Sequence, residues 1–440
     1  MMINRFCITV ALALLTTATN AQTSMSLQEC IQFAIDHNIS IEQRKLQEEN
    51  AAVSLNTSKN SWLPSLSASL SQGFGFGRSA GRDGSTIDNT SANTSFQVGA
   101  QMPVFTGLRI SNQIKQDKFS LLAAAENLEK AKRDITVNVA AYYLNALYYK
   151  GLTNIQRSQL ALDKETLEKA EALFNAGRKP ESEVASARAQ VAVTEHSLTE
   201  AQGNEIVARL DLIHLLNLEC SADQFAVVEL DTANILADIP LPEVVFDYAV
   251  ETHPSIKAAK YNLEASKYQL KVARSGYLPT VSLSASYSNS FYHNYGSEFN
   301  QSFGQQLKIN GSEYLGLSVN IPIFDRFSTR NSMRQAKVNI ASQNWSLLEA
   351  RQNLNKEIQQ AYWNAAKARD SYFSAQKAAE STGIAYQYEA ERYAAGRSTA
   401  LDLQNARAKL EKSLQDELQS KGEYLSRVKI LDFYNGQDFR

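Results

Sequence analysis

The chain of 440 residues carries the same pattern twice, and this duplication limits the folds available to it. Ser40 and Ile41 match Ser255 and Ile256, 215 residues later. Four additional residues then enter the second copy, and from Pro103, which matches Pro322, the spacing stays at 219 residues. A register that holds over about 100 positions predicts a tandem repeat, in which each element of the first half recurs in the second.

The repeat sets the expected domain organisation. Arg5, a following apolar run and small residues up to Ala21 predict a secretory signal peptide over 1–21, the alternative being a buried N-terminal strand. The first repeat is then expected over 22–218 and the second over 243–440, joined by a linker at 219–242.

Two long helices are predicted where proline is absent. No proline falls between Pro103 and Pro180 or after Pro322, and proline disrupts helix interiors. Apolar residues recur there with the period of about 3.5 residues that is typical of a coiled coil. We expect long helices over 109–175 and 328–394, each about 100 Å long. Each is expected to pack antiparallel with shorter partners, at 38–61, 181–217, 255–276 and 400–434.

Four stretches between these helices alternate apolar and polar residues. In the first, Leu66, Ala68 and Leu70 share one phase and serines occupy the other. A period of two predicts strands with one apolar and one polar face. The strands are expected at about 65–77, 94–104, 280–292 and 313–323.

Charge decides which kind of sheet these strands form. The segments 65–77, 94–105, 280–292 and 314–324 contain no Asp, Glu, Lys or Arg, although these residues make up 20% of the chain. The solvent face of a soluble sheet accepts charges, whereas a Lys or Arg that faces lipid at mid-membrane costs about 2–4 kcal/mol. The pattern therefore favours a membrane β-barrel over a half-buried soluble sheet.

Four strands cannot enclose a lumen, and open strand edges are not tolerated in lipid. Two chains would supply eight strands, whose interior fills with side chains, whereas three supply twelve, which is wide enough to conduct. The expected fold is thus an α+β membrane protein that trimerises into a 12-stranded β-barrel continuous with a 12-helix barrel.

Other features of the sequence argue against enzymes and nucleic-acid binding. The net charge of −2 gives no sign of a nucleic-acid partner, and no apolar run after residue 21 reaches the length of about 18 residues that a transmembrane helix needs. Residues 73–77 are rich in glycine but carry no lysine, so they form no phosphate loop. No catalytic constellation is present, so we expect a protein that is not an enzyme and has no cofactor.

Neither histidine nor cysteine residues indicate a metal site. None of the histidines has a partner at metal-ligand spacing: His37, His196, His214, His253 and His293. Cys30 and Cys220 could form a disulfide in an oxidising compartment, although two free buried thiols are favoured.

Taken together, these features resemble the TolC family of outer-membrane efflux and secretion channels. The resemblance covers the whole mature chain and depends on motifs present in both copies. These are Trp62-Leu63-Pro64 and Tyr277-Leu278-Pro279 before strands, Pro103-Val104-Phe105 and Pro322-Ile323-Phe324 after strands, and Ala-Gly-Arg helix turns followed ten residues later by Ala-Arg-Ala.

The resemblance implies a homotrimer in the outer membrane of a Gram-negative bacterium, with a long periplasmic extension and the linker 219–242 in its equatorial region. It implies a passive duct for efflux or type I secretion, surrounded by outer-membrane lipid and driven by an inner-membrane RND or ABC pump through a periplasmic membrane-fusion (adaptor) protein. The alternative is a structural, envelope-spanning coiled coil or adhesin without a pore. The sequence does not distinguish drugs, metals and proteins as cargo.

Two helix turns, 176–180 and 395–399, are expected at the periplasmic tip. Each contains a glycine, the residue suited to a left-handed helix cap. The resemblance implies that the adaptor docks at these turns, on Ala176, Gly177, Arg178, Ala395, Gly396 and Arg397.

A periplasmic gate is expected beside the turns. Glu183 and Asp402 each follow a turn glycine by six residues, and the resemblance implies a ring of three Asp402 carboxylates and a bond from Tyr393 to Glu183. Asn405 replaces a second ring acid of the family and Ser398 replaces a basic residue, so we expect a single ring that binds multivalent cations weakly. The alternative is that both acids are solvated first-turn residues, favoured by the helix dipole.

Overall fold

A computed structural model describes residues 23–80, 83–88, 90–229, 239–295, 297 and 299–436. The expected signal peptide and part of the expected linker lie outside these residues. The chain forms two compact units that cut across the sequence repeats: one takes residues up to Lys45, Asn127–Ile256 and the chain from Ala350, and the other takes Leu46–Glu126 and Lys257–Glu349.

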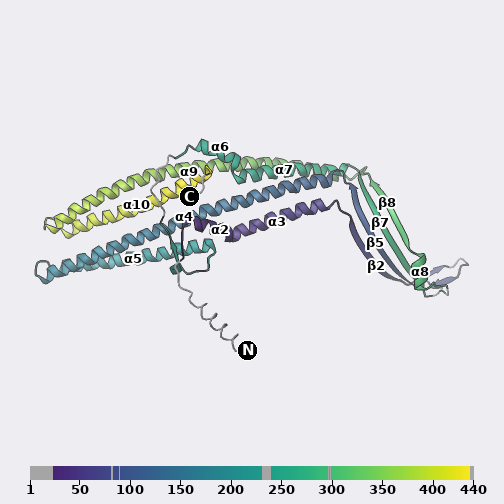
Figure 1. The fold of residues 1–440 in the computed structure, drawn as a ribbon, viewed down its shortest axis with the longest axis horizontal. Coiled ribbons are helices and arrows are strands. Elements are labelled where there is room, and N and C mark those ends of the chain that lie inside the picture. The colour runs from purple at the N-terminus through teal and green to yellow at the C-terminus, as the bar shows by residue number, and fades with distance from the viewer. Residues whose placement is uncertain are drawn as a thin grey trace, which may run out of the picture. The chain divides into compact units, whose positions relative to one another are not determined.

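The two long helices have the predicted bounds (Figure 1). Helix α4 spans Arg109–Asn175 and helix α9 spans Ser328–Ala394, and each has 67 residues. The uninterrupted coiled-coil pattern and the absence of proline account for their length. Both helices contribute residues to both units.

The four shorter helices also lie within a few residues of their predicted positions. They are α3 (Ile39–Asn60), α5 (Glu181–Leu216), α7 (Pro254–Arg274) and α10 (Ala400–Tyr434). Two further helices, α2 (Leu27–His37) and α6 (Pro242–Thr252), were not predicted. They begin 215 residues apart, which extends the repeat to an earlier element.

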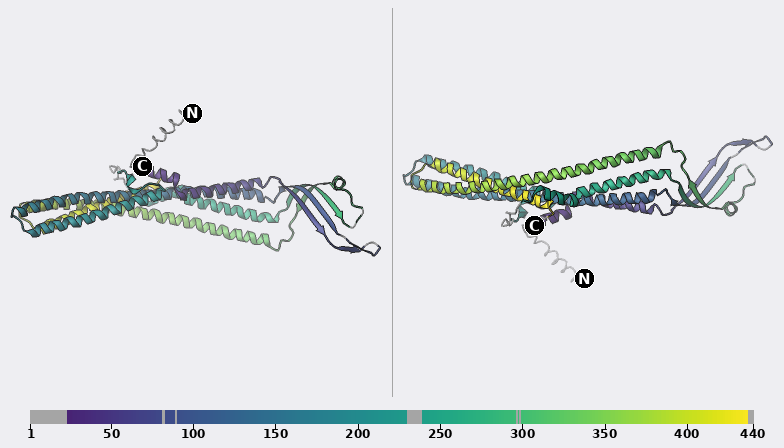
Figure 2. Two further views of the ribbon diagram at one scale, coloured as in Figure 1. Left: turned by 90° about the horizontal axis from the view of Figure 1, so that it is seen from below. Right: turned by 90° about the horizontal axis from the view of Figure 1, so that it is seen from above.

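In the first unit, α4 lies beside α5 and α9 lies beside α10, as the labelled view of Figure 1 and the two further views of Figure 2 show. Arg188 on α5 forms an ion pair with Glu171 on α4, with a nitrogen–oxygen distance of 2.9 Å. Thr382 on α9 lies 2.5 Å from the hydroxyl of Ser413 on α10. Each pair is therefore an antiparallel hairpin made within one repeat.

The core of the first unit lies where α2, α4 and α5 meet. Strand β1 (Thr23–Met25) pairs in parallel with β6 (Phe225–Val227), which follows a short 3-10 helix, η1 (Ala222–Gln224). The buried Tyr143 hydroxyl donates to the carbonyls of Met25 and Val228, at 3.0 and 2.7 Å. This side chain joins the strand pair to the long helix.

The second unit contains the four predicted strands in one antiparallel sheet, in the order β2-β5-β7-β8. Their bounds are Ser65–Gly75, Ser91–Phe105, Thr280–Asn294 and Ser312–Asn320. Strand β8 ends at Asn320, three residues short of its predicted end, whereas β5 continues through Pro103 to Phe105 with a register shift between these two residues. Between the strands lie the β3–β4 hairpin (Arg78–Ala80 with Thr86–Asp88) and α8 (Phe303–Ile309), while η2 (Ser275–Tyr277) precedes β7.

The register gives the sheet two chemically different faces. Leu66, Ala100, Ala285 and Leu315 are aligned across the four strands on one face, and the row of Ser69, Gln97, Ser288 and Ser312 lies on the other. All eleven residues of β2 are exposed, in both phases. A single chain therefore leaves an apolar and a polar face uncovered on its edge strand.

Aromatic and polar contacts join the helices of the second unit. Phe119 on α4 stacks on Tyr268 of α7 with ring centroids 5.6 Å apart, and Ser58 on α3 donates to Asp117 on α4.

In the parts of the chain that the structure describes, no helix combines the length and the apolarity required to span a membrane.

Candidate functional site at the two helix turns

Both helix turns have the predicted left-handed caps. Gly177 has φ +69° and Gly396 has φ +71°. The Gly177 amide donates to the Phe174 carbonyl at 2.8 Å and the Arg178 amide to the Leu173 carbonyl at 2.9 Å, which is the Schellman arrangement. The second turn repeats it with Gly396 and Arg397. A Cβ at either glycine would have no neighbour within 4 Å, so glycine is favoured here by its backbone conformation and not by crowding.

The residues expected to dock an adaptor all lie on the surface. Ala176, Gly177 and Arg178 are exposed, and so are Ala395, Gly396 and Arg397. Leu173 and Phe174, just before the first turn, are also exposed although they are apolar.

The predicted bond between the repeats at the tip is present. The Tyr393 hydroxyl on α9 donates to Glu183 Oε2 on α5, at 3.2 Å. Lys179, which the sequence analysis did not single out, pairs with Glu183 Oε1 at 2.8 Å and lies 5.0 Å from the centre of the Tyr393 ring. The hydrogen bond to Glu183 is the main cause that raises the pKa of Lys179. The sequence does contain a signal for this pair, because Lys179 precedes Glu183 by four residues at the start of a helix, and side chains at that spacing can meet.

Asp402 takes part in a helix cap. Its amide donates to the Thr399 hydroxyl oxygen at 3.1 Å, and its carboxylate accepts from the Thr399 amide at 3.3 Å and from the Thr399 hydroxyl at 2.6 Å, so the two residues form a capping box. The bond from Thr399 holds the pKa of Asp402 below its usual range. This local arrangement agrees with the alternative of a solvated first-turn acid, and it leaves the exposed carboxylate charged.

Cations lie close to the expected gate acid. Asp402 and Asn405 line a groove between α9 and α10 together with Arg392 and Lys409. Arg392 pairs with Glu389 at 2.9 Å, and Ser398 donates its hydroxyl hydrogen to the same carboxylate. The groove therefore holds two acidic and two basic side chains, Glu389 and Asp402 with Arg392 and Lys409.

A buried polar cluster joins the two repeats farther from the turns. Arg407 on α10 forms an ion pair with Asp163 on α4, and these side chains are 11% and 2% exposed. Thr194 on α5 donates to the other oxygen of Asp163 at 2.7 Å. The sequence analysis assigned Asp163 no role, although it falls on the apolar stripe of the coiled coil, where a charge indicates a buried partner.

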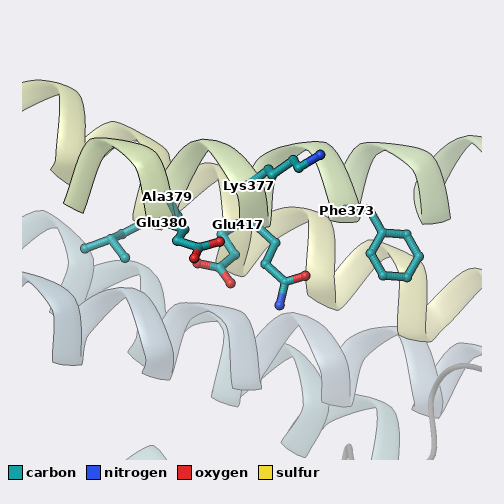
Figure 3. Close-up of a pocket in the computed structure, with 7 residues that line it drawn as sticks. Phe373, Lys377, Ala379, Glu380 and Glu417 are labelled. Atoms are coloured by element: carbon teal, nitrogen blue, oxygen red, sulfur yellow. The ribbon is translucent and has the colours of Figure 1, made fainter. Parts of the chain in front are cut away.

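A second groove lies on another part of the α9–α10 pair and is drawn in Figure 3. It has a volume of about 720 Å³ and combines apolar and charged side chains: Phe373, Gln376, Lys377, Ala379, Glu380, Leu414 and Glu417. Glu380 and Glu417 point into it from the two helices.

The described residues hold no group of three or more His, Cys, Asp or Glu side chains arranged to bind a metal ion. Cys30 and Cys220 are both free, as favoured by the sequence; Cys30 is buried, whereas Cys220 is only half-buried. Burial raises the pKa of the Cys30 thiol to about 12, so it is inert at neutral pH.

Comparison with known proteins gives one consistent answer. The chain is 22% identical over 363 residues to the outer membrane efflux protein BepC of Brucella suis. The aligned residues cover 82% of this chain and 74% of that protein. It is 24% identical over 360 residues to the protein CyaE of Bordetella pertussis, with 79% and 70% covered.

Its fold is similar to the crystal structure of the Campylobacter jejuni CmeC outer membrane channel, with a TM-score of 0.74, 19% identity, and 93% and 85% of the chains covered. The family model described as outer membrane efflux protein matches residues 30–218 and 245–437. These two stretches, most of the chain, show that it belongs to the outer membrane efflux protein family.

Proposed function

We propose that this chain is the protomer of a homotrimeric outer-membrane channel for efflux or type I secretion. Its family consists of outer-membrane channels and not of enzymes. The observation that carries the proposal is the four-stranded sheet. It has one apolar and one polar face, and β2 and β8 are its two edge strands.

Lipid and water account for the two faces. Apart from Glu313 at the start of β8, the apolar face of the four strands has no Asp, Glu, Lys or Arg. Such a face is stable against acyl chains, and the serine-rich face suits a water-filled lumen. The edges need partners, because unpaired backbone groups cost several kcal/mol each in lipid. Three copies joined edge to edge supply twelve strands, and they satisfy both requirements.

The remaining parts follow from the same proposal. Residues 1–21 direct export, the two repeats 22–218 and 243–440 supply equivalent staves of the tube, and 219–242 links them. The helices extend into the periplasm, where an adaptor contacts the two turns and an RND or ABC pump supplies the energy. Glu183, Tyr393 and a ring of Asp402 residues hold the tip closed.

Adjacent residues on β8 offer a matched test. Leu317 aligns with Leu283 on the apolar face and Ser318 aligns with Ser282 on the polar face. We expect Leu317→Asp to abolish assembly in the outer membrane and Ser318→Asp to be tolerated, measured by membrane fractionation, native mass spectrometry and conductance in planar bilayers. Equal loss with both variants would contradict a barrel. A folded outer-membrane trimer without conductance would favour the structural alternative.

A further inference from the structure

Strand β7 is longer than its neighbour β8. The first residue of β8, Ser312, aligns with Ser288, whereas β7 continues to Asn294. A strand edge without a partner leaves backbone N–H and C=O groups unpaired, and such groups are costly when they lie near lipid. The residues of β7 after Ser288 therefore need another partner on this side.

Three side-chain amides take the place of a partner strand, and we call them the amide ladder: Asn300, Gln306 and Asn310. Gln306 accepts from the Tyr292 amide at 2.9 Å and donates to the Tyr292 carbonyl at 2.8 Å. Asn300 makes the same two bonds with Asn294, at 2.9 and 2.7 Å. Asn310 donates to the Ser290 carbonyl at 2.7 Å. Every second residue of this edge is thus paired with an amide, as it would be by an antiparallel strand.

The amide ladder holds helix α8 at the far end of β7 (Figure 1). Gln306 lies in the middle of α8 and is 6% exposed. Phe303, at the start of α8, packs against Phe291 of β7 with ring centroids 5.2 Å apart. Phe291 has the same phase as Leu283 and Ala285, which belong to the apolar face of the sheet. Helix α8 therefore contacts the apolar side of the sheet.

The apolar face changes in character where α8 lies. A row near the helices is aliphatic and consists of Leu66, Ala100, Ala285 and Leu315. A row beside α8 is mixed and consists of Gln72, Thr94 and Phe291. Within the mixed row, the Thr94 hydroxyl donates to the Gln72 side chain. Aromatic and polar groups together are typical of the boundary between acyl chains and headgroups.

The distance along β7 agrees with the thickness of a membrane. Phe291 follows Val281, near the start of β7, by ten residues, which is an advance of about 33 Å along a strand. At a strand tilt of about 40°, this corresponds to about 25 Å along the membrane normal, the height of the apolar band of an outer-membrane barrel. Since Val281 lies at the end of the strand next to the helices, Phe291 and α8 lie at the opposite boundary.

The exposed side chains of α8 suit this boundary. Phe303 is 56% exposed and Leu307 is 41% exposed, and side chains four residues apart lie on the same side of a helix. Lys308 is exposed on another side. A lysine there can lay its aliphatic stem on apolar surface and place its ammonium group among headgroup phosphates.

We propose that α8 is an interfacial anchor, which the amide ladder holds on the β7 edge and which contacts the outer-leaflet lipid through Phe303 and Leu307. The occupant is lipid, because α8 continues the face of the sheet that is proposed to border acyl chains, and because the chain belongs to a family of outer-membrane proteins. The inference rests on the proposed barrel and adds a lipid contact outside its strands.

Spin labelling in vesicles tests the anchor. In a background with Cys7, Cys30 and Cys220 replaced by alanine, a nitroxide is attached to Leu307→Cys, to Leu315→Cys on the apolar face or to Ser318→Cys on the polar face. The protein is reconstituted in vesicles of phosphatidylethanolamine and phosphatidylglycerol. We compare collision of each label with oxygen, which concentrates in acyl chains, and with a water-soluble nickel chelate. The ratio of oxygen to nickel collisions should be several-fold higher at Leu315 than at Ser318, with Leu307 in between.

The label at Leu315 separates failure of the anchor from failure of the barrel. A ratio at Leu307 as low as at Ser318, with Leu315 still in lipid, overturns the anchor and leaves the barrel intact. A label at Leu307 that is shielded from both reagents overturns it as well, because protein would then cover α8. Low ratios at both Leu307 and Leu315 overturn the anchor and the barrel together.

A second variant tests the amide ladder. Gln306→Ala removes both bonds to Tyr292, so the label at Leu307 should become more mobile and its ratio should fall to the value at Ser318. The label at Leu315 should not change. Gln301→Ala, which replaces an exposed amide just before α8, is the matched control and should leave the label at Leu307 in lipid. An unchanged label at Leu307 in Gln306→Ala would show that the amide ladder does not hold α8 there.

Discussion

Arg407 of the second repeat forms a buried ion pair with Asp163 of the first, and this contact fastens one hairpin to the other. Three helices meet there, because Thr194 on α5 donates to the same carboxylate that Arg407 reaches from α10. The equivalent arginine of the first repeat, Arg188, makes only an exposed pair with Glu171. Two residues at the same place in a repeat thus have different energetic roles.

This difference predicts unequal effects of the same substitution. Arg407→Met leaves the Asp163 carboxylate buried without its partner and should destabilise the protein by about 3–5 kcal/mol. Arg188→Met removes an exposed pair and should cost less than about 1 kcal/mol. Thermal unfolding in detergent, monitored by circular dichroism, measures the loss of stability in both variants.

The double variant Asp163→Leu, Arg407→Met serves as the control for packing. It replaces the pair by apolar side chains, and Thr194 keeps its bond to the Gln190 carbonyl, so much of the lost stability should return. Equal destabilisation by the two single arginine substitutions would show that burial of the Arg407 pair has no energetic consequence.

The sequence was most informative where the backbone is governed by periodicity and proline. The bounds of α4 and α9 and the phase of all four strands were predictable, because proline excludes helix interiors and a strand alternates its faces. The glycine caps were predictable for a similar local reason, since Gly177 and Gly396 need positive φ.

Contacts between elements far apart in sequence were less predictable. Asp163 and Arg407 are 244 positions apart, and only the packing of α10 on α4 brings them together. Helices α2 and α6 are short, and their ends depend on local caps, such as the capping box of Ser26 and Glu29. The Tyr393–Glu183 bond was expected from the family resemblance and not from spacing.

The gate proposal predicts that Tyr393 and Asp402 act differently on the channel. Tyr393→Phe removes the donor to Glu183 and should raise the basal single-channel conductance, because one link between α9 and α5 at the tip is lost. Replacing Lys179 by Met should act in the same direction, since it also pairs with Glu183.

Asp402 needs a substitution that separates charge from capping. Asp402→Asn keeps an acceptor for Thr399 and removes the charge, so it should relieve block by divalent or trivalent cations added from the periplasmic side. Asp402→Glu should retain the block. A gate elsewhere in the channel would leave conductance and block unchanged in all these variants.

Docking of an adaptor at the turns predicts a position-dependent effect of bulk. Ala176→Trp and Ala395→Trp should reduce export several-fold without lowering the amount of trimer, because both side chains are exposed and neither supports the fold. The measured quantity is export in cells, with the trimer quantified in parallel. Ala161→Trp, at an exposed position on α4 away from the turns, is the control and should export normally. Normal export by the turn variants would argue against docking there.

His253 predicts a loss of stability in mild acid. It follows α6, and its ring stacks on Tyr434 with centroids 6.1 Å apart. Burial first, and then Arg133 and Lys130 over the opposing Asp134, lower the pKa of His253 from 6.5 to about 4. The unfolded chain therefore takes up a proton at a higher pH than the folded protein, so stability declines as pH falls from about 6.5 to about 4. Between pH 6.5 and about pH 5 the decline is about 2 kcal/mol.

Thermal unfolding of the wild type and of His253→Gln at about pH 7 and about pH 5 measures this contribution. The variant cannot titrate at this position, so its transition temperature should fall less on acidification than that of the wild type. His196→Gln is the control, because that imidazole is 74% exposed and its replacement should leave the wild-type pH response unchanged. If His253→Gln responded to acid as strongly as the wild type, the acid sensitivity would originate from other groups, and the neutral state of the half-buried His253 imidazole would make no contribution to it.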